Sequence, residues 1–483
     1  MAFDGFQDFL TALERAGELR HIRCEVDPHL EITEIADRVM KSPNGGPALV
    51  FDHPRNCSVP VAINTLGSRK RISMALGVND IEEIASEIDD LLKPEVPAGL
   101  VDKIKMLPKL SRLSAMPPKT VSNGICQEVV RTGDEVDLNE LPVLHCWPQD
   151  GGPTITLPLV FTFDPATGKR NVGMYRLQVL SRNTTGMHWQ LHHGGAEHYR
   201  QSEELNRRIE VAVALGGDPA VIYAATAPLP PNLDEMLFAG FLRRKPVSLV
   251  PCKTVSLQVP ADAEYVLEGY VNPHERCTEG PFGDHTGYYS LADQYPIFHV
   301  TALTHRRNPV YPTTIVGIPP MEDGWIGKAT ERIFLPLIRL SLPEVVDINL
   351  PVQGIFHNLA LISIRKRYAG QAFKVMNAVW SLGQMMLTKI VCVFDEDVNV
   401  QNMDEVIWRL GNNIDPERDT LIVKGPIDVL DHSARMVGFG SKIGFDATRK
   451  LPSEGFVREW PDVIRMSPEV KARVDAMWNE LGL

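Results

Sequence analysis

The amino-acid sequence predicts a mixed α/β (α+β) protein of several domains, with a β-rich centre between two parts that combine helices and strands. At 483 residues the chain exceeds what one hydrophobic core usually supports, so about two to four domains are expected. Apolar residues at helical spacing occur before residue 110 and after residue 325, whereas short strand-like runs fill the sequence between them. We therefore expect an N-terminal α/β domain over residues 1–110, a β-rich domain over 111–325 and a C-terminal α/β domain over 326–483.

The N-terminal part is expected to be a small scaffold. Apolar residues over 6–13 are spaced for one face of a helix, and Gly17 follows as a stop. Prolines between residues 94 and 118 mark a connector, and nothing in this part indicates chemistry. The same patterns predict further helices over 32–39 and 81–91 and short strands over 48–51 and 59–63.

The central part is expected to be mostly β. Glycine, proline and asparagine separate its strand-like runs, as in a barrel or a sandwich with helical insertions. One insertion, over 233–242 with Asn232 at its start, has helical character. The expected strands cover residues 155–163, 173–180, 188–191, 209–215, 220–225, 248–250, 264–270 and 298–305.

The C-terminal part returns to alternating helices and strands. Helices are expected over 372–387 and 403–410, and a buried strand over 389–394 leads into three acidic residues. An apolar helix over 470–481 closes the chain. This helix suits a contact between subunits and a dock within one chain equally well.

Composition and charge exclude several classes of partner. The net charge of −12 argues against nucleic acid and against an anionic membrane surface, since either would require a basic face. The N-terminus lacks the basic and apolar regions of a signal peptide, and no run approaches the roughly 18 apolar residues of a membrane helix. The seven cysteines are far apart and odd in number, which indicates reduced thiols. A cytoplasmic protein without a membrane segment is expected.

The stretch 279–289 carries the strongest chemical signal. It holds Glu279 and Asp284, a histidine and two tyrosines, broken by three glycines and a proline, so it cannot form a regular helix. A shaped loop leading into a short strand is expected. Two carboxylates on such a loop suit acid–base chemistry, in which one stays charged while its surroundings raise the pKa of the other. The alternative is a glycine-rich turn with solvated acids.

Three other polar stretches stand out in the β-rich part. In 171–176, an asparagine and an arginine lie among strand-forming residues, where a turn and an exposed side chain are the simpler explanation. In 188–195, three histidines beside two glycines favour either metal ligands, or backbone N–H groups open to a phosphate, or an exposed loop. Glu235 in the first turn of a helix is usually a partner of the helix dipole. No phosphate-binding loop of the Walker type and no dinucleotide fingerprint occurs.

Taken together, these stretches resemble the UbiD family of decarboxylases along nearly the whole chain. The resemblance is closest to the 4-hydroxy-3-polyprenylbenzoate decarboxylases of quinone biosynthesis. The residues that carry it are 279–289, 171–176, 188–195 and 233–240, supported by 27–38, 367–370 and 440–442.

The resemblance implies a cofactor, a fold and partners. It implies prenylated FMN with a divalent metal, usually Mn²⁺ or otherwise Mg²⁺, often together with K⁺. The central domain would be a split β-barrel that binds the flavin, and the C-terminal domain would serve oligomerisation. A flavin prenyltransferase would supply the cofactor, and a homo-oligomer, either a dimer or a hexamer, is implied.

The resemblance also implies roles for individual residues. Asp284 would deliver a proton, Glu279 would tune the site, and Arg176 would hold both carboxylates. The implied metal ligands are Asn171, His192 and Glu235. The implied flavin contacts are Met174, Tyr175, Arg176, His188, Trp189, Gln190, His193 and Gly194. Family members commonly carry a lysine or arginine in place of His188, and the quinone-pathway members carry an arginine in place of His193. Binding of the cofactor phosphate would then depend more on the metal and on backbone N–H groups.

The implied activity is reversible, non-oxidative decarboxylation of an aromatic acid. A 4-hydroxybenzoate- or naphthoate-type intermediate of ubiquinone or menaquinone synthesis is the expected substrate. The alternatives are a decarboxylase or carboxylase of a catabolic aromatic or heteroaromatic acid, a non-catalytic flavin-binding subunit, and an ordinary FMN oxidoreductase. The complete set of Glu279, Arg176 and Asp284 speaks against a subunit that only binds flavin.

Overall fold

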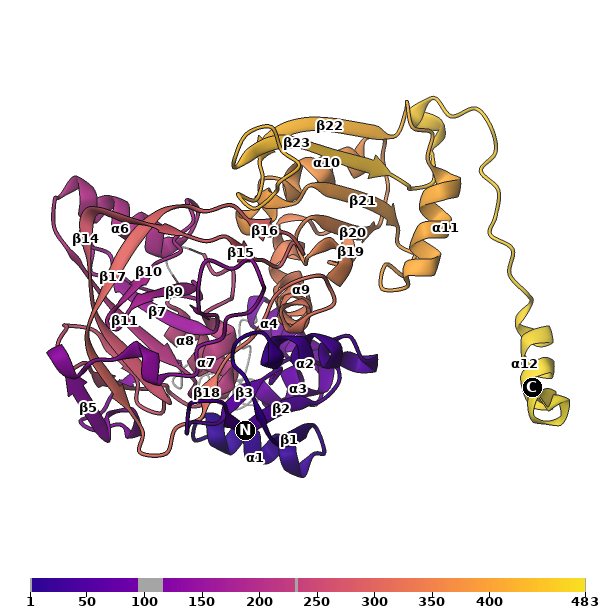
Figure 1. Ribbon diagram of the computed structural model, residues 1–483. Helices are drawn as coiled ribbons and strands as arrows, with labels where there is room; N and C mark the ends of the chain where they lie inside the picture. The colour runs from indigo at the N-terminus through magenta and orange to yellow at the C-terminus, as the bar shows by residue number, and fades with distance from the viewer. Residues whose placement is uncertain (1, 94–115, 231–232, 483) are drawn as a thin grey trace, which may run out of the picture.

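The structure, a computed structural model, describes residues 2–93, 116–230 and 233–482. An N-terminal α/β unit, a central half-barrel of antiparallel strands and a C-terminal mixed sheet follow one another along the chain (Figure 1). The mixed α/β multidomain class predicted from the sequence is confirmed. The predicted connector falls mostly on residues 94–115, which lie outside the described residues.

The N-terminal unit packs its helices on a small sheet with the strand order β1-β2-β3-β18. The last strand, β18 (Tyr311–Pro312), comes from much later in the chain and pairs in parallel with β3. The predicted apolar face of the first helix is buried. The elements are α1 (Phe6–Arg15), β1 (Leu19–Val26), α2 (Glu31–Met40), β2 (Ala48–Pro54), β3 (Val61–Ile63), α3 (Arg69–Ala75) and α4 (Glu82–Leu92).

The central unit is a curled antiparallel sheet with the order β6-β9-β10-β17-β14-β11-β7-β8, and β5 pairs with β17. Its strands are β5 (Val129–Thr132), β6 (Thr154–Ile155), β7 (Pro158–Phe163), β8 (Arg170–Gly173), β9 (Leu177–Ser181), β10 (Thr184–Gly186), β11 (Ile209–Leu215), β14 (Tyr265–Glu279) and β17 (Asp293–His305). Small additions are β4 (Lys119–Thr120), β12 (Ser248–Pro251), β13 (Gln258–Pro260), β15 (Phe282–Gly283), β16 (Tyr289–Ser290) and helix α6 (Gly194–Glu204).

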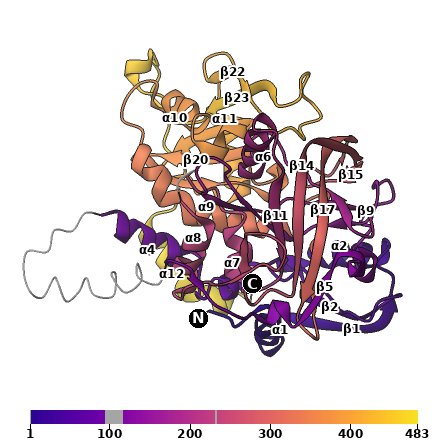
Figure 2. The same ribbon diagram turned by 90° about the vertical axis from the view of Figure 1, so that its left-hand side faces the viewer.

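Strand β11 explains why the middle of this sheet is continuously apolar. Val211 and Val213 point into one core, whereas Ala212 and Ala214 point into another, so both faces of the strand are buried. Helices α7 (Pro219–Ala224) and α8 (Glu235–Arg243) cover one face, between the sheet and α9 (Glu322–Ser341) (Figure 2).

The C-terminal unit is a mixed sheet with the order β19-β20-β21-β23-β22 and helices on both faces. Beyond residue 455 the chain continues as a C-terminal arm, residues 456–482, whose helix α12 buries no side chain (Figure 1). The elements are β19 (Val345–Asn349), β20 (Leu359–Ile364), α10 (Gln371–Val379), β21 (Ile390–Asp395), α11 (Met403–Asn413), β22 (Thr420–Pro426), β23 (Phe439–Asp446) and α12 (Pro468–Met477). In the described part of the chain, every helix is too short or too polar to cross a bilayer.

Two expected strands are absent among the described residues. Residues 220–225 form the helix α7 instead, because the Asp218 side chain accepts from the Ala220 N–H and Pro219 occupies the first helical position. Residues 188–191 are irregular, since this stretch turns from β10 into α6, with the Trp189 N–H donating to the Met187 carbonyl over 2.8 Å.

Other expected elements differ in their limits. The strand expected over 155–163 is divided into β6 and β7, and the strand expected over 173–180 is divided between β8 and β9. The helix expected over 372–387 ends at Val379, before Gly383 adopts a left-handed conformation. The side chain of Asp234 caps α8, whereas the predicted start at Asn232 lies outside the described residues.

Candidate active site

An arginine whose side chain is 10% exposed joins two carboxylates beside the central sheet. Arg176 donates from Nε to Glu279 Oε1 over 2.9 Å and from Nη2 to Glu279 Oε2 over 3.3 Å, and its Nη1 donates to Asp284 Oδ2. Its guanidinium carbon lies 4.5 Å from the centre of the Phe282 ring. Glu279 is 1% exposed and Asp284 is 5% exposed. One cation thus compensates two buried anions, which interior carboxylates require.

The local course of the chain brings these three side chains to one place. Glu279 is the last residue of β14, and Asp284 follows β15 within the β15–β16 hairpin. Arg176 lies in the irregular stretch between β8 and β9. Gly280, with a φ of 90°, turns the chain after β14, and its N–H donates to Gln178 Oε1 over 2.7 Å. The expected shaped loop leading into a short strand is therefore present.

Both carboxyl groups are held in the ionised form. Burial alone would raise the pKa of Glu279, but the His188 hydrogen bond and the Arg176 charge outweigh it and lower this pKa to about 2. Burial would also raise the pKa of Asp284, yet Arg176 and His285 hold it well below its ordinary value. The expectation that the surroundings raise the pKa of one acid of this pair is wrong, because Arg176 lies against both.

Two histidines complete the network, one against each carboxylate. His188 is buried with Nδ1 at 3.0 Å from Glu279 Oε2, and burial and the Arg176 charge lower its pKa, so it donates as a neutral imidazole. His285 places Nδ1 at 2.9 Å from Asp284 Oδ1. Burial opposes a charge there, but this contact outweighs it and raises the pKa of His285 to about 9. Sequence reasoning gave His285 no role, although its position directly after the acid was a usable signal.

Glu235, at the start of α8, contacts β8 at the residue that follows Asn171. The Val172 N–H donates to Glu235 Oε2 over 3.0 Å, which ties the first residue of the helix to the strand. Burial raises the pKa of Glu235 to about 7. A neighbouring cation would return such a carboxyl group to its ionised form, so this position suits a metal ligand.

The start of α6 lies directly against Asn171. A Cβ atom on Gly194 would come within 2.0 Å of Asn171 Oδ1, so a side chain there would displace the asparagine. His193 is the N-cap of this helix, and His192 is exposed on the turn that precedes it. The structure thus brings Asn171 beside the segment that carries His192. The glycines at 194 and 195 form the first turn of a helix rather than a loop.

The remaining predicted contacts come from two segments, 174–176 and 188–194, that touch each other. The His188 N–H donates to the Arg176 carbonyl over 3.2 Å. The buried Tyr175 ring stacks on His193 at 5.0 Å, and the Gln190 amide lies 3.4 Å from His188 Nε2. Met174 is half-buried and packs against the core between the sheet and α8.

Unpaired polar atoms surround the start of α6. Within the described residues, Trp189 Nε1 and His193 Nδ1 are buried and make no hydrogen bond. Burial lowers the pKa of His193 to about 4, so this ring is neutral. The free N–H groups in the first turn of a helix attract anions. Neutral polar groups around a helix N-terminus fit a phosphate that is held without a cationic side chain.

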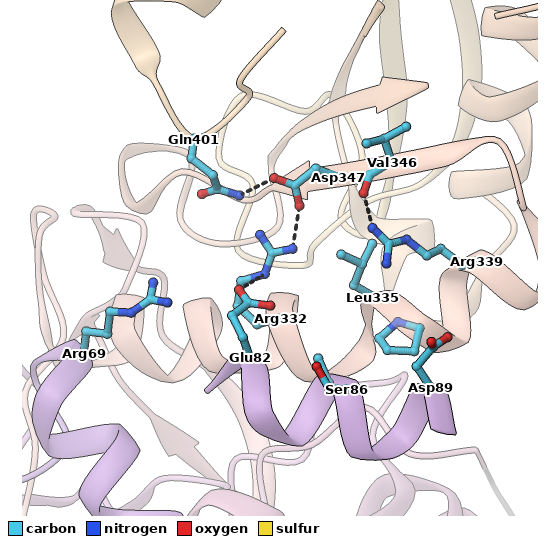
Figure 3. Close-up of a pocket in the computed structure, with 12 residues that line it drawn as sticks. Arg69, Glu82, Ser86, Asp89, Arg332, Leu335, Arg339, Val346, Asp347 and Gln401 are labelled. Atoms are coloured by element: carbon cyan, nitrogen blue, oxygen red, sulfur yellow. Dashed lines mark hydrogen bonds and ion pairs between the residues drawn. The ribbon is translucent and has the colours of Figure 1, made fainter. Parts of the chain in front are cut away.

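A separate hollow of about 550 Å³ lies between α4 and α9 (Figure 3). Its charged side chains already have partners: Arg332 contacts Glu82 and Asp347, and Arg339 donates to the Val346 carbonyl. Ligand sites are usually lined mainly by apolar and aromatic side chains. This hollow has none of the acid–base groups described above.

Comparisons with known proteins agree with this arrangement. Family models described as 3-octaprenyl-4-hydroxybenzoate carboxy-lyase (UbiD) match the chain with their N-terminal domain over residues 10–88, their Rift-related domain over 119–319 and their C-terminal domain over 324–447. An uncharacterised protein of Aquifex aeolicus is 54% identical over 99% of this chain and 98% of its own length.

Two solved enzymes have the same architecture along the whole chain. Vanillic acid decarboxylase of Sedimentibacter hydroxybenzoicus is 28% identical and covers 100% of this chain and 99% of its own, with a TM-score of 0.87 for its closed form and 0.79 for an open form. The UbiD-class enzyme HmfF of Pelotomaculum thermopropionicum, in complex with FMN, is 31% identical, covers 97% of this chain and 98% of its own, and has a TM-score of 0.79. An evolved dimeric form of HmfF was solved with prFMN.

Replacing Arg176 with alanine is expected to destabilise the protein by about 3–5 kcal/mol near pH 8, because it removes the guanidinium that lies against both buried acids, Glu279 and Asp284. Burial then raises the pKa of both acids, so the deficit should shrink as protonation removes their charge towards about pH 5. Urea unfolding of the variant and of wild type at both pH values measures this difference.

Arg131→Ala is the matched control, since Arg131 forms an exposed ion pair with Glu140. It should cost no more than about 1 kcal/mol at either pH. An Arg176→Ala deficit that does not depend on pH would contradict the charge-based explanation.

Proposed function

Because the chain belongs to the UbiD family of carboxy-lyases, we propose that it removes CO₂ from an aromatic carboxylic acid with prenylated FMN as its cofactor. The observation that carries this proposal is the buried network of Arg176, Glu279 and Asp284 beside the N-terminus of α6. The network is suited to acid–base chemistry, and the helix terminus is suited to a flavin phosphate. The complexes of HmfF with FMN and prFMN support the choice of cofactor.

We assign the substrate to the 4-hydroxybenzoate or naphthoate type found in ubiquinone and menaquinone synthesis. The description of the family supports this class. A catabolic aromatic or heteroaromatic acid is the second candidate, which the likeness to vanillic acid decarboxylase supports. A screen of the purified, cofactor-loaded enzyme against both classes of acid separates the two candidates.

The chemistry explains why a cofactor is needed. Loss of CO₂ from an aromatic ring leaves an electron pair in the ring plane, where the π system of the ring cannot delocalise it. The prenylated flavin supplies the electron sink for this step when it is bound. The residues of the chain bind and orient the acid and return a proton to the ring carbon. Arg176 presents a planar fork suited to a carboxylate, and Glu279 holds that fork in place.

Asp284 is the group that we assign to proton delivery. Arg176 and His285 favour its ionised form, so a proton placed on Asp284 is readily given up. This suits a donor whose acceptor is a carbon atom. His285 contacts Oδ1 and Arg176 contacts Oδ2, so the orientation of the carboxyl group is fixed from both sides.

Asn171, His192 and Glu235 are the residues that we assign to a divalent cation at the flavin phosphate. Two oxygen donors and one imidazole suit Mn²⁺ or Mg²⁺ better than a softer ion. The half-buried Glu235 carboxyl group, with its raised pKa, is the member that would gain most from the cation. The phosphate would meet the N–H groups of α6 next to Asn171, whose side chain lies directly against Gly194.

We also propose that the C-terminal arm joins copies of this chain into a dimer or a hexamer. Helix α12 buries no residue, although Val457 and Ile464 before it are 97% and 100% exposed and Trp478 after it is 49% exposed. Exposed apolar side chains along an arm of this kind are typical of a contact with another chain.

Asp284→Asn is expected to reduce decarboxylation by about 10²–10⁴-fold while the flavin stays bound, because the amide cannot carry the transferred proton. Chromatographic product analysis and the flavin absorbance spectrum measure the two quantities. Asp293→Asn is the control, since Asp293 is an exposed acid that pairs with Glu279 across β14 and β17. Full activity in Asp284→Asn would remove this residue from proton delivery.

Wild-type protein produced together with a flavin prenyltransferase and Mn²⁺ is expected to carry a flavin heavier than FMN by one five-carbon unit. Glu235→Ala should lose metal and flavin together, because the cation would link this carboxylate to the phosphate. Intact-cofactor mass and metal analysis test both statements, with Glu197→Ala, an exposed acid in the first turn of α6, as the control. Unmodified FMN in wild type would contradict the cofactor, and a variant that keeps both groups would exclude Glu235 as a ligand.

Removal of residues 456–483 is expected to reduce the mass in solution to that of a single chain, because the arm carries the proposed contact. Light scattering coupled to size-exclusion chromatography measures this mass. Trp478→Ser should weaken the assembly, whereas Lys471→Ser, a polar position on α12, should not. An unchanged mass after truncation would place the subunit contact elsewhere.

A further inference from the structure

Three side chains of metal-ligating type meet where the C-terminal unit contacts the central unit. One ligand atom from each of His285, His357 and Asp428 lies within 4.8 Å of the others. His357 Nε2 is 2.9 Å from Asp428 Oδ2, and His285 Nε2 is 3.9 Å from the same oxygen. His285 follows β15 in the central unit, whereas His357 precedes β20 and Asp428 follows β22 in the C-terminal unit.

The two imidazoles offer nitrogen atoms that have no hydrogen-bond partner. Within the described residues, His285 Nε2 and His357 Nε2 are buried and unpaired. His357 Nε2 is close to Asp428 without the alignment of a hydrogen bond. Buried polar atoms are normally paired, so two such nitrogens facing one carboxylate indicate a missing ligand.

The other ring nitrogen of His285 is already fixed. Its Nδ1 lies 2.9 Å from Asp284 Oδ1, and a carboxylate there selects the N–H form of Nδ1. Histidine ligands of metals characteristically donate their second ring N–H to a carboxylate, which sets the tautomer and aims the free lone pair at the metal. Asp284 and His285 show this arrangement, with Nε2 directed toward Asp428 and His357, and a bound ion would replace the proton that a charged His285 carries on Nε2.

We propose that His285, His357 and Asp428 bind a divalent transition-metal ion of the kind that prefers imidazole, such as Zn²⁺, Co²⁺ or Fe²⁺. Two imidazoles and one carboxylate form a known ligand set for these ions. Ligands at about 2.1 Å from a tetrahedral metal are roughly 3.4 Å apart, and the observed separations lie on both sides of this value. Small side-chain movements would therefore complete the site.

This site differs from the one assigned to Asn171, His192 and Glu235. That set has two oxygen donors and suits Mn²⁺ or Mg²⁺, whereas the present set has two nitrogen donors and selects ions later in the transition series. Its ligands also come from both units, so a bound ion would link them.

The arrangement of the units in this chain is more similar to the closed form of vanillic acid decarboxylase, with a TM-score of 0.87, than to an open form, with a TM-score of 0.79.

Cobalt is a suitable probe, because Co²⁺ in a site of low coordination number absorbs visible light. The full-length, flavin-loaded protein is treated with a chelator, supplied with excess Mn²⁺ to fill the oxygen-rich site, and titrated with Co²⁺. We expect one tightly bound Co²⁺ per chain with visible absorption bands, and a Co²⁺-dependent rise in melting temperature. Zn²⁺ should displace the Co²⁺ and abolish the bands.

His357→Ala and Asp428→Asn should each weaken Co²⁺ binding by about 100-fold or more and remove the thermal shift. His432→Ala is the matched control, since this exposed histidine stacks on Tyr288 at the same contact without joining the cluster. Glu235→Ala, which is expected to lack the flavin, should still show the Co²⁺ bands when it is titrated in the same way, and this result would separate the site from the proposed cofactor site. Absence of bound Co²⁺ in wild type would contradict the proposed metal site. Equal Co²⁺ binding by His357→Ala and wild type would exclude His357 as a ligand.

Discussion

The structure around the candidate site depends on one guanidinium group that neutralises two buried carboxylates. Without Arg176, Glu279 would keep only the neutral His188 beside it and Asp284 would depend on His285, so burial would raise the pKa of Glu279. The surrounding elements place the three side chains together. Arg176 lies in the irregular stretch between β8 and β9, Glu279 is the last residue of β14, and Asp284 lies in the β15–β16 hairpin. Phe282 then packs on the guanidinium and restricts its movement. The result is a rigid charged centre in a largely apolar interior, where electrostatic interactions are stronger than in water.

The N-termini of α6 and α8 lie on one side of this centre. The first turn of α6 offers N–H groups next to Asn171, and the first residue of α8 is the half-buried Glu235. One terminus suits a phosphate, and the adjacent carboxyl group suits the cation that accompanies it. Residues 174–176 and 188–194 contact each other and connect this place to the carboxylates. Anchoring and chemistry are therefore assigned to different parts of one continuous surface.

Local sequence predicted the features that depend on local physics. Glycines and a proline predicted the loop over 279–289, and apolar spacing predicted α1, α2 and β11. Local sequence gave wrong predictions where contacts between distant residues determine the structure or the pKa. The apolar, β-branched run after Asp218 became a helix because a capping side chain and a proline outweighed its strand propensity. The pKa directions of Glu279 and Asp284 depend on an arginine more than one hundred residues earlier in the chain. Two further neighbours of His285, His357 and Asp428, likewise come from the C-terminal unit, so no motif around residue 285 predicts them.

The strand β18 has a consequence for the order in which the protein can be completed during synthesis. Its residues Tyr311 and Pro312 pair with Val61 and Ala62, so β3 remains an open sheet edge until residue 312 has left the ribosome. Exposed edges of this kind invite pairing with other chains. The first unit to be translated is thus completed only after the central unit has been synthesised, and until then its open edge is exposed to association with other chains.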